Sequence, residues 1–153
     1  MFREMRKKDR QLPRQEGLDI LENGEYGILA TVGDDRYPYA VPVNYVYTSG
    51  HIYFHCATEG HKLDNIHFNN KVSFCVVNKS EIVPEKFTTK YKSVIVFGKA
   101  VLVTGEEKRE ALKKLIYKYS PEYEEVGLKY IEKEFERVSV VKIHVDTITA
   151  KGN

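Results

Sequence analysis

The sequence predicts a mainly β protein with added helices, built around a six-stranded antiparallel barrel. Six segments have the apolar alternation or the β-branched and aromatic content of strands: 26–33, 37–47, 51–57, 71–77, 92–103 and 137–145. The first three follow one another through short turns, and the two longest helical segments come late in the chain. Strands joined by short connections pair in antiparallel fashion, and closing such a sheet protects its edges.

Length and composition are typical of a single globular domain covering residues 1–153. Hydrophobic residues make up 42% and charged residues 30%, and the formal net charge of +2 is too small to predict nucleic-acid binding. Cys56 and Cys75 lie in apolar stretches without CxxC spacing, which predicts buried, reduced thiols. No signal peptide and no apolar run of about 18 residues are present. We therefore expect a cytoplasmic protein that binds neither membrane nor nucleic acid.

A basic arm, residues 1–12, opens the chain. The first fourteen residues contain six basic side chains: Arg3, Arg6, Lys7, Lys8, Arg10 and Arg14. Only Glu4 and Asp9 oppose them. The simplest interpretation is a solvated arm, which a partner subunit would accommodate on its surface. Nucleic-acid binding is the alternative, although no regularly spaced aromatic residues support it.

The first helix and strand follow directly. A short helix is expected over 13–23, with Leu18 and Leu21 facing inward and Gly24 at its end. The compact apolar segment 26–33 is then expected to be a strand.

The next two strands, 37–47 and 51–57, alternate clearly. One face of each is apolar: Val41, Val43, Tyr45 and Tyr47 in the first, and Ile52, Phe54 and Cys56 in the second. Turns at 34–35 and 48–50 complete a three-stranded meander. Pro42 interrupts the first of these strands. Because proline has no N–H to donate to a neighbouring strand, it belongs at a sheet edge or an interruption.

The second half of the chain adds three strands and three helices. A helix near 60–70 leads into the strand 71–77, and 78–91 is expected to be a polar loop. Gly98 predicts a bend or bulge within the strand 92–103.

A helix over 106–119 presents an apolar face, and a second helix runs through about residue 135. The inward residues of the first are Leu112, Leu115, Ile116 and Tyr119. Ser120 and Pro121 are expected to start the second helix.

The segment HCATEGHKLDNIHFNN, residues 55–70, is the most informative about function. His55, His61 and His67 are six residues apart, so His61 and His67 point about 120° apart on a helix, which does not favour a metal site. A phosphate site fits better. Thr58 would cap a helix whose first turn holds Gly60, His61 and Lys62, with Leu63 and Ile66 packing inward. Free N–H groups and positive charge at a helix start bind anions. A plain capped helix is the commoner alternative.

The interrupted strand around Pro42 offers a second half of a site. A broken ladder leaves backbone groups free to face a ligand, and the following hairpin brings His55 and Cys56 close by. A flat ring along 41–45 with its phosphate near 61–62 is geometrically reasonable. A simple edge strand is again the commoner alternative.

Four stretches of this sequence resemble a known family. They are GEYGILATVGDDRYPYAVPVNYVY, IYFHCATEGHKLDNI, VSFCVV and EKFTTKYKSVIVFGKAVLV. In this order they resemble the FMN-binding split β-barrel group of the pyridoxamine 5′-phosphate oxidase superfamily, and within it the 5-nitroimidazole resistance proteins. The resemblance runs from about Lys7 to about Lys151.

This resemblance implies a split β-barrel homodimer with FMN at the subunit interface. It implies cofactor contacts from residues on three segments and on the partner subunit: Pro42, Val43, Asn44, Tyr45, Phe54, His55, Cys56, Gly60, His61, Lys62, Tyr91 and Ser93. The run 42–45 matches the strand along the flavin ring, 54–56 its neighbour, and 60–62 the phosphate-binding turn. Tyr91 and Ser93 match a position that reaches the flavin from the partner, with Thr88 and Thr89 in the same wall.

The C-terminus departs from the vitamin-oxidising members of the superfamily. Its sequence, VDTITAKGN, lacks their arginine-and-histidine pattern, so vitamin B6 oxidation is not expected. The subgroup often carries Thr-Gly-Lys here, where this chain has Thr149, Ala150 and Lys151.

The expected function is an FMN-dependent oxidoreductase. It would take electrons from a nicotinamide or another reductant and pass them to a small-molecule acceptor such as a nitroaromatic, with His55 as the candidate catalytic residue. A structural role for His55 is equally compatible with the sequence. The alternative function is a non-enzymatic flavin or haem binder, with His55, His61 or His144 as axial ligands.

Overall fold

The computed structural model describes residues 1–153 and contains one seven-stranded antiparallel sheet. Its strands are β1 (Gly27–Val32), β2 (Pro38–Val43), β3 (Val46–Thr48), β4 (His51–Ala57), β5 (Lys71–Val83), β6 (Thr88–Val103) and β7 (Val138–Gly152). They pair in the order β2-β1-β5-β6-β7-β4-β3, so β2 and β3 are the two edges of an unclosed sheet. The predicted split-barrel class is confirmed, with one strand more than expected.

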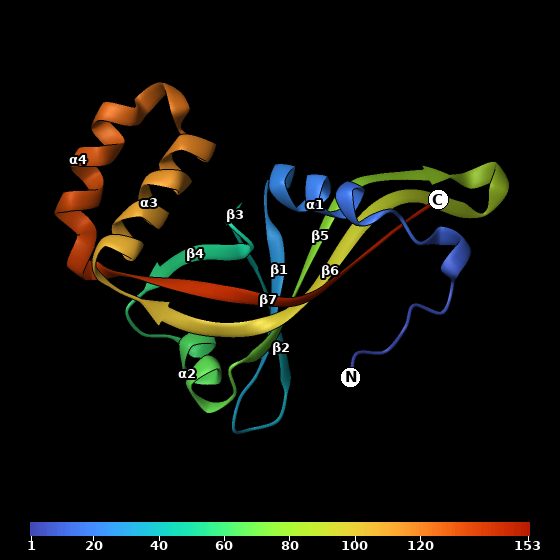
Figure 1. The fold of residues 1–153 in the computed structure, drawn as a ribbon, viewed down its shortest axis with the longest axis horizontal. Coiled ribbons are helices and arrows are strands. Elements are labelled where there is room, and N and C mark those ends of the chain that lie inside the picture. The colour runs from blue at the N-terminus through green and yellow to red at the C-terminus, as the bar shows by residue number, and fades with distance from the viewer.

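Four α-helices accompany the sheet. They are α1 (Arg14–Asn23), α2 (His61–Phe68), α3 (Gly105–Tyr119) and α4 (Glu124–Glu134), with short 3-10 turns η1 (Lys8–Arg10), η2 (Pro84–Lys86), η3 (Pro121–Tyr123) and η4 (Phe135–Arg137). Figure 1 shows α3 and α4 side by side at one end of the molecule, and the β5–β6 hairpin projecting at the other. None of the four α-helices combines the length and the apolar composition of a membrane-spanning segment.

The extra strand comes from the segment 37–47, which was predicted as one strand and is two. β2 pairs with β1, whereas β3 pairs with β4, so the two halves belong to opposite edges of the sheet. Tyr45 lies at the break with its side chain fully buried, and its hydroxyl donates to the Leu21 carbonyl. Its backbone N–H donates to the Tyr119 hydroxyl at 3.0 Å instead of to a strand.

The prediction of a polar loop over residues 78–91 is wrong. β5 and β6 stay paired from Lys79 opposite Lys92 to Val83 opposite Thr88, and only η2 and Phe87 form the tip. The polar sequence predicted a loop because this part of the hairpin extends beyond the core, where most side chains other than Val83 are exposed.

The bulge predicted at Gly98 is confirmed. The β6–β7 register shifts between Phe97 and Gly98, and a Cβ added at Gly98 would lie 2.3 Å from the His144 carbonyl oxygen. The edge position predicted for Pro42 is also confirmed, since β2 is an edge strand.

Two hydrophobic cores lie on opposite faces of β4. Phe54 belongs to the larger core, of 17 residues, together with Phe74 and Leu63. Tyr53, the preceding residue, belongs to a smaller core of seven residues beneath α3 and α4. Strand alternation produces this division, because successive side chains point to opposite faces. Cys56 and Cys75, predicted to be buried, are half-buried and unpaired.

The helix faces follow the predicted pattern except in α1, where Leu18 is only half-buried and Ile20 is buried beside Leu21 instead. Leu21, Leu63, Ile66, Leu112 and Leu115 are buried as expected. The predicted Thr58 cap is wrong, because α2 begins one residue after Gly60 and no side chain caps it. Ser120 and Pro121 lead into η3 before α4 begins at Glu124, and the Ser120 side chain makes no cap bond either.

Candidate functional site

The start of α2 is open to a ligand. Gly60 occupies the N-cap position with φ +150° and ψ 174°, a conformation that is essentially restricted to glycine. No atom lies within 4 Å of the position that a Cβ would take. The first-turn N–H groups have no side-chain cap, so a helix start with its partial positive charge faces free space.

Side chains from β2 and β4 meet this helix start. The His61 ring lies against the Tyr39 ring of β2, with 4.0 Å between the ring centroids and 31° between their planes. Lys62 lies near the end of β4, and its positive charge acts on the pKa values of two residues there, His55 and Cys56. Partial burial lowers the pKa of His55 below its ordinary value, and the Lys62 charge adds to this decrease. Burial raises the pKa of the Cys56 thiol, which Lys62 partly opposes.

The neutral imidazole of His55 is therefore the dominant form at pH 7. Neighbouring atoms surround part of its ring, but its side chain keeps exposed surface in the single chain, on the opposite face of β4 from Phe54. An uncharged imidazole can donate from one nitrogen and accept at the other. Together β2, β4 and α2 bring His55, Cys56, Gly60, His61 and Lys62 into one region.

The four residues of the run 42–45 differ in whether their side chains are exposed enough to contact a ligand. Pro42 is exposed on the β2 edge, and Val43 packs partly against the core. Asn44 is exposed and lines a cavity of about 530 Å³. The side chains of Tyr45 and Phe54 have no exposed surface, so only their backbone groups can contact a ligand.

Two residues of this cavity were missed by the sequence reasoning. Lys118 donates from Nζ to the Tyr45 carbonyl oxygen at 2.9 Å and lies 3.9 Å from the Tyr45 ring centroid. Burial lowers the pKa of Lys118 to about 8. The Tyr119 hydroxyl donates to the Glu25 carbonyl oxygen at 2.6 Å. Tyr119 was expected to face inward, but nothing in the sequence distinguishes Lys118 from the other lysines of α3.

Tyr91 and Ser93 do not lie with the α2 cluster in one chain. They pair with Ser80 and Val77 of β5, towards the hairpin. The N–H of Ala100 bonds to Asn70, two residues after α2, and Ser93 is seven residues from Ala100 along β6, or about 20 Å.

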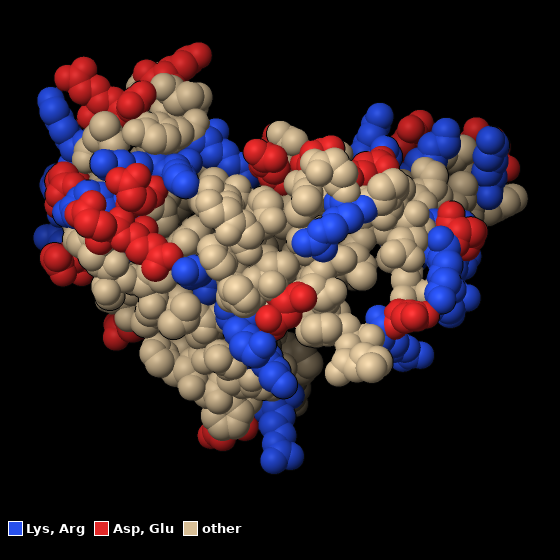
Figure 2. All heavy atoms as spheres, in the orientation of Figure 1, with Lys and Arg blue, Asp and Glu red and all other residues tan.

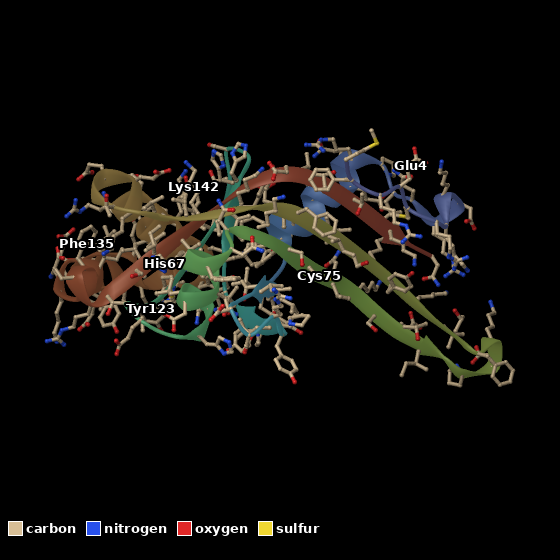
Figure 3. The ribbon with its side chains drawn as sticks, turned by 90° about the horizontal axis from the view of Figure 1, so that it is seen from below. Glu4, His67, Cys75, Tyr123, Phe135 and Lys142 are labelled. Atoms are coloured by element: carbon tan, nitrogen blue, oxygen red, sulfur yellow. The ribbon has the colours of Figure 1, made fainter.

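The face of the sheet that carries Ser93 is turned away from the larger core. Register places one row across five strands on it: Pro42, Ile28, Cys75, Ile95 and Thr149. Ile95 and Phe97 are each 42% exposed. Figure 3 shows Cys75 midway along this sheet. A partly apolar, solvent-exposed face of this kind is typical of an interface.

Histidine positions do not favour a metal. No group of three His, Cys, Asp or Glu side chains is arranged to hold a metal ion. His144 pairs with His51, four residues along β4 from His55, so His144 and His55 lie apart on the sheet, and each stays a separate candidate for a haem ligand.

Residues 13–152 match the pyridoxamine 5′-phosphate oxidase family, and the chain belongs to that family. The match covers the whole sheet and all four α-helices. Among curated proteins no sequence matches significantly.

Solved structures share the fold at low sequence identity. A proposed 5-nitroimidazole antibiotic resistance protein from Bacteroides thetaiotaomicron is 24% identical, with a TM-score of 0.75 over 92% of this chain and 85% of that one. The conserved hypothetical protein Rv2991 from Mycobacterium tuberculosis is 18% identical, with a TM-score of 0.83 over 97% and 90%. A protein from Mycobacterium smegmatis that binds FAD and haem is 18% identical, with a TM-score of 0.78 over 94% and 73%.

Proposed function

We propose that the protein is an FMN-dependent oxidoreductase that reduces a small acceptor and holds the cofactor where β2, β4 and α2 meet. The observation that carries this proposal is the uncapped start of α2, with Gly60 leaving open space and Lys62 beside it. Membership of the pyridoxamine 5′-phosphate oxidase family supports it, as does the fold shared with a protein that binds FAD and haem.

The residues present fit a flavin phosphate. Gly60 lets an anion approach the backbone, because no side chain fills the space above it. Lys62 contributes a full positive charge, and the first-turn N–H groups contribute donors. Tyr39 holds the His61 ring in place through their contact at 4.0 Å.

The rings would lie along the free edge of β2 towards Asn44. An edge strand has backbone groups without a strand partner, and these recognise the polar edge of a flat heterocycle. Bound FMN would supply hydride and single-electron transfer. His55 contributes a neutral imidazole at the end of β4, where it can orient an acceptor or share a proton with it.

A homodimer completes the proposed site. Within one chain Ser93 is about 20 Å along β6 from the residue bonded to Asn70, so it would reach the cofactor from a second copy. The exposed row containing Ile28, Cys75 and Ile95 would provide the apolar part of the interface.

The reductant is proposed to be a nicotinamide or another reduced carrier, and the acceptor a nitroaromatic or similar small molecule. The 24% identical structure described as a proposed 5-nitroimidazole resistance protein supports this substrate class. Steady-state oxidation of NADH and NADPH with nitro compounds, quinones and free flavins would identify both partners.

Titration of the purified protein with FMN tests the proposal. Lys62→Glu removes a charge-assisted hydrogen bond and introduces repulsion, so the Kd for FMN is expected to rise about 10- to 100-fold or more. Lys71→Glu, a matched charge reversal three residues beyond the end of α2, is expected to leave the Kd unchanged.

Three results would contradict the proposal. They are the absence of flavin absorbance bands after FMN is added, an unchanged Kd in Lys62→Glu, and a molar mass of one chain with FMN bound. A Soret band on haem addition, lost on replacing His55, His61 or His144 by alanine, would favour the haem-binding alternative.

A further inference from the structure

The cavity of about 530 Å³ lies between the end of α1 and the end of α3. Its lining comes from residues 22–26, from Asn44 between β2 and β3, and from Lys118 and Tyr119. Only Asn44 belongs also to the proposed flavin site. Figure 2 shows a notch in the surface between the α3–α4 pair and α1, bordered by both basic and acidic side chains. The volume is within the ~300–1,000 Å³ of typical ligand pockets, so a small molecule can enter.

Lys118 is the one basic residue in this lining. Its Nζ donates to the Tyr45 carbonyl oxygen, lies 3.9 Å from the Tyr45 ring centroid, and makes no other hydrogen bond in the chain. Nine ion pairs are present, and none includes Lys118, although Glu22 and Glu25 line the same cavity. The cavity therefore contains a half-buried amine without a carboxylate partner.

These surroundings favour the uncharged form of the amine. Burial lowers the pKa of Lys118 to about 8, and no opposite charge contributes to offset that decrease. At pH 8 about half of the Lys118 amines are uncharged, compared with less than about 1% for a lysine of ordinary pKa. An uncharged amine has a free electron pair, and a desolvated lysine beside a cavity is the kind of residue that forms Schiff bases with carbonyl compounds.

We propose that Lys118 is a carbonyl-binding residue, whose amine condenses with a short, uncharged hydroxyaldehyde in this cavity to form an imine and release water. The nitrogen electron pair forms the new C–N bond, and the carbonyl π electrons move to the oxygen, which receives one N–H proton through solvent. The hydroxyl group then leaves as water with the second N–H proton, and the C=N bond forms. Nothing is oxidised or reduced, so no further reactant is needed.

The hydrogen bonds around Nζ allow it to leave the Tyr45 carbonyl oxygen. That oxygen lies 3.0 Å from the Tyr119 hydroxyl, which can donate to it in place of Lys118. The hydroxyl otherwise donates to the Glu25 carbonyl oxygen at 2.6 Å, so rotation of one O–H bond is enough for the exchange. An unprotonated imine is uncharged, and condensation therefore also removes the cost of burying an ammonium group.

The remaining lining residues determine which carbonyl compound fits. Glu22 and Glu25 place two negative charges beside one positive charge, which disfavours a compound that carries a carboxylate. Carboxylate oxygens accept hydrogen bonds from hydroxyl groups, and the amides of Asn23 and Asn44 both donate and accept. A short aldehyde with several hydroxyl groups and no charge matches this set of side chains.

Reductive trapping of the full-length protein at pH 7.5 tests the proposal. Glyceraldehyde is the probe, and sodium cyanoborohydride converts its imine into a stable secondary amine, which peptide mass spectrometry assigns to a particular lysine. The uncharged fraction alone favours Lys118 over an ordinary lysine by more than about a hundredfold. Because a lower pKa also lowers intrinsic nucleophilicity, we expect Lys118 to be labelled about tenfold faster than Lys114. With glyoxylate, an aldehyde that carries a carboxylate, this preference is expected to fall.

Lys118→Met is expected to remove the preferentially labelled site, with circular dichroism as the check on folding. Lys114→Met is the matched control, because Lys114 lies one turn earlier on α3 and donates to the Thr48 hydroxyl, and it should leave the labelling of Lys118 unchanged. Equal labelling of Lys118 and Lys114 in the wild-type protein would overturn the proposal, and this comparison needs no variant. An equal preference with glyoxylate would overturn the ligand class.

This site needs neither FMN nor a second copy of the chain. Trapping is measured without added flavin, so a protein that fails to bind FMN still gives a result for Lys118. Conversely, the absence of a Lys118 adduct leaves the titration with FMN, and the effect of Lys62→Glu on it, unaffected.

Discussion

Lys118 provides the sharpest test of the electrostatics of this fold. Its ammonium is partly buried against the Tyr45 ring, and burial lowers the pKa of Lys118 from 10.5 to about 8. In the unfolded chain this amine keeps its ordinary pKa. Between pH 8 and pH 10.5 the folded protein therefore binds fewer protons than the unfolded chain, and its stability rises with pH. Below pH 8 the amine is charged in both states, and the full cost of burying the charge is present.

The size of the effect follows from the shift. A difference of 2.5 pKa units, 10.5 minus 8, corresponds to about 3.4 kcal/mol at most. Because the side chain keeps contact with solvent, screening reduces this to about 1–2 kcal/mol. We therefore expect the free energy of unfolding of the wild-type protein, relative to Lys118→Met, to rise by about 1–2 kcal/mol between pH 7.5 and pH 10.

Urea unfolding of both proteins across this range measures the difference. Comparison with Lys118→Met is needed because Cys56 and Cys75, whose thiol pKa values are raised by burial, lower the stability of both proteins above about pH 8.5. Lys114→Met is the matched control, since Lys114 lies one turn earlier on α3 and donates to the Thr48 hydroxyl at 3.0 Å. Parallel curves for the wild-type protein and Lys118→Met would refute the reasoning.

Three further substitutions, and one matched control at Phe87, test how the fold positions the site. Gly60→Ala should cost about 1–3 kcal/mol of unfolding free energy, because its φ of +150° strains any side chain although the space above it is open; no change in urea midpoint would contradict this. Gly98→Ala should lower the free energy of unfolding by about 1–3 kcal/mol for a different reason, since the added Cβ would lie 2.3 Å from the His144 carbonyl oxygen. A melting temperature equal to that of the wild-type protein would contradict this expectation. Phe54→Ala should lower the free energy of unfolding by about 3–5 kcal/mol, because Phe54 is fully buried. Phe87 is 97% exposed at the hairpin tip, so Phe87→Ala should change the free energy of unfolding by no more than about 0.5 kcal/mol. Equal losses of unfolding free energy in the two variants would disprove the assignment of the core.

Most of the helices and turns could be predicted because their signals are local. The apolar positions Leu63 and Ile66 are both buried, and they mark the inward face of α2 by spacing alone. Gly98 predicted a bulge because a residue without a side chain permits close approach of the neighbouring strand. Pro42 predicted a strand edge because it lacks an N–H.

Half of the candidate site was equally visible in the sequence. Gly60, His61 and Lys62 follow one another at a helix start, so their proximity needs no tertiary information. The prediction of Thr58 as the N-cap residue was wrong, since Gly60 occupies the N-cap position directly before α2. A threonine within reach of a helix start is a weaker signal than the backbone conformation that only glycine adopts.

The sequence by itself determined which segments become helices, where strands turn or bulge, and that a cationic helix start follows β4, because these depend on spacing and on the backbone preferences of proline and glycine. Only the tertiary structure decided that 37–47 divides between two sheet edges, that 78–91 continues a paired hairpin, and that Lys118 meets Tyr45. Alternation shows which face of a strand is buried, but not which strand lies next to it. Neighbours distant in sequence, such as Tyr45 and Tyr119, are set by how the whole chain packs.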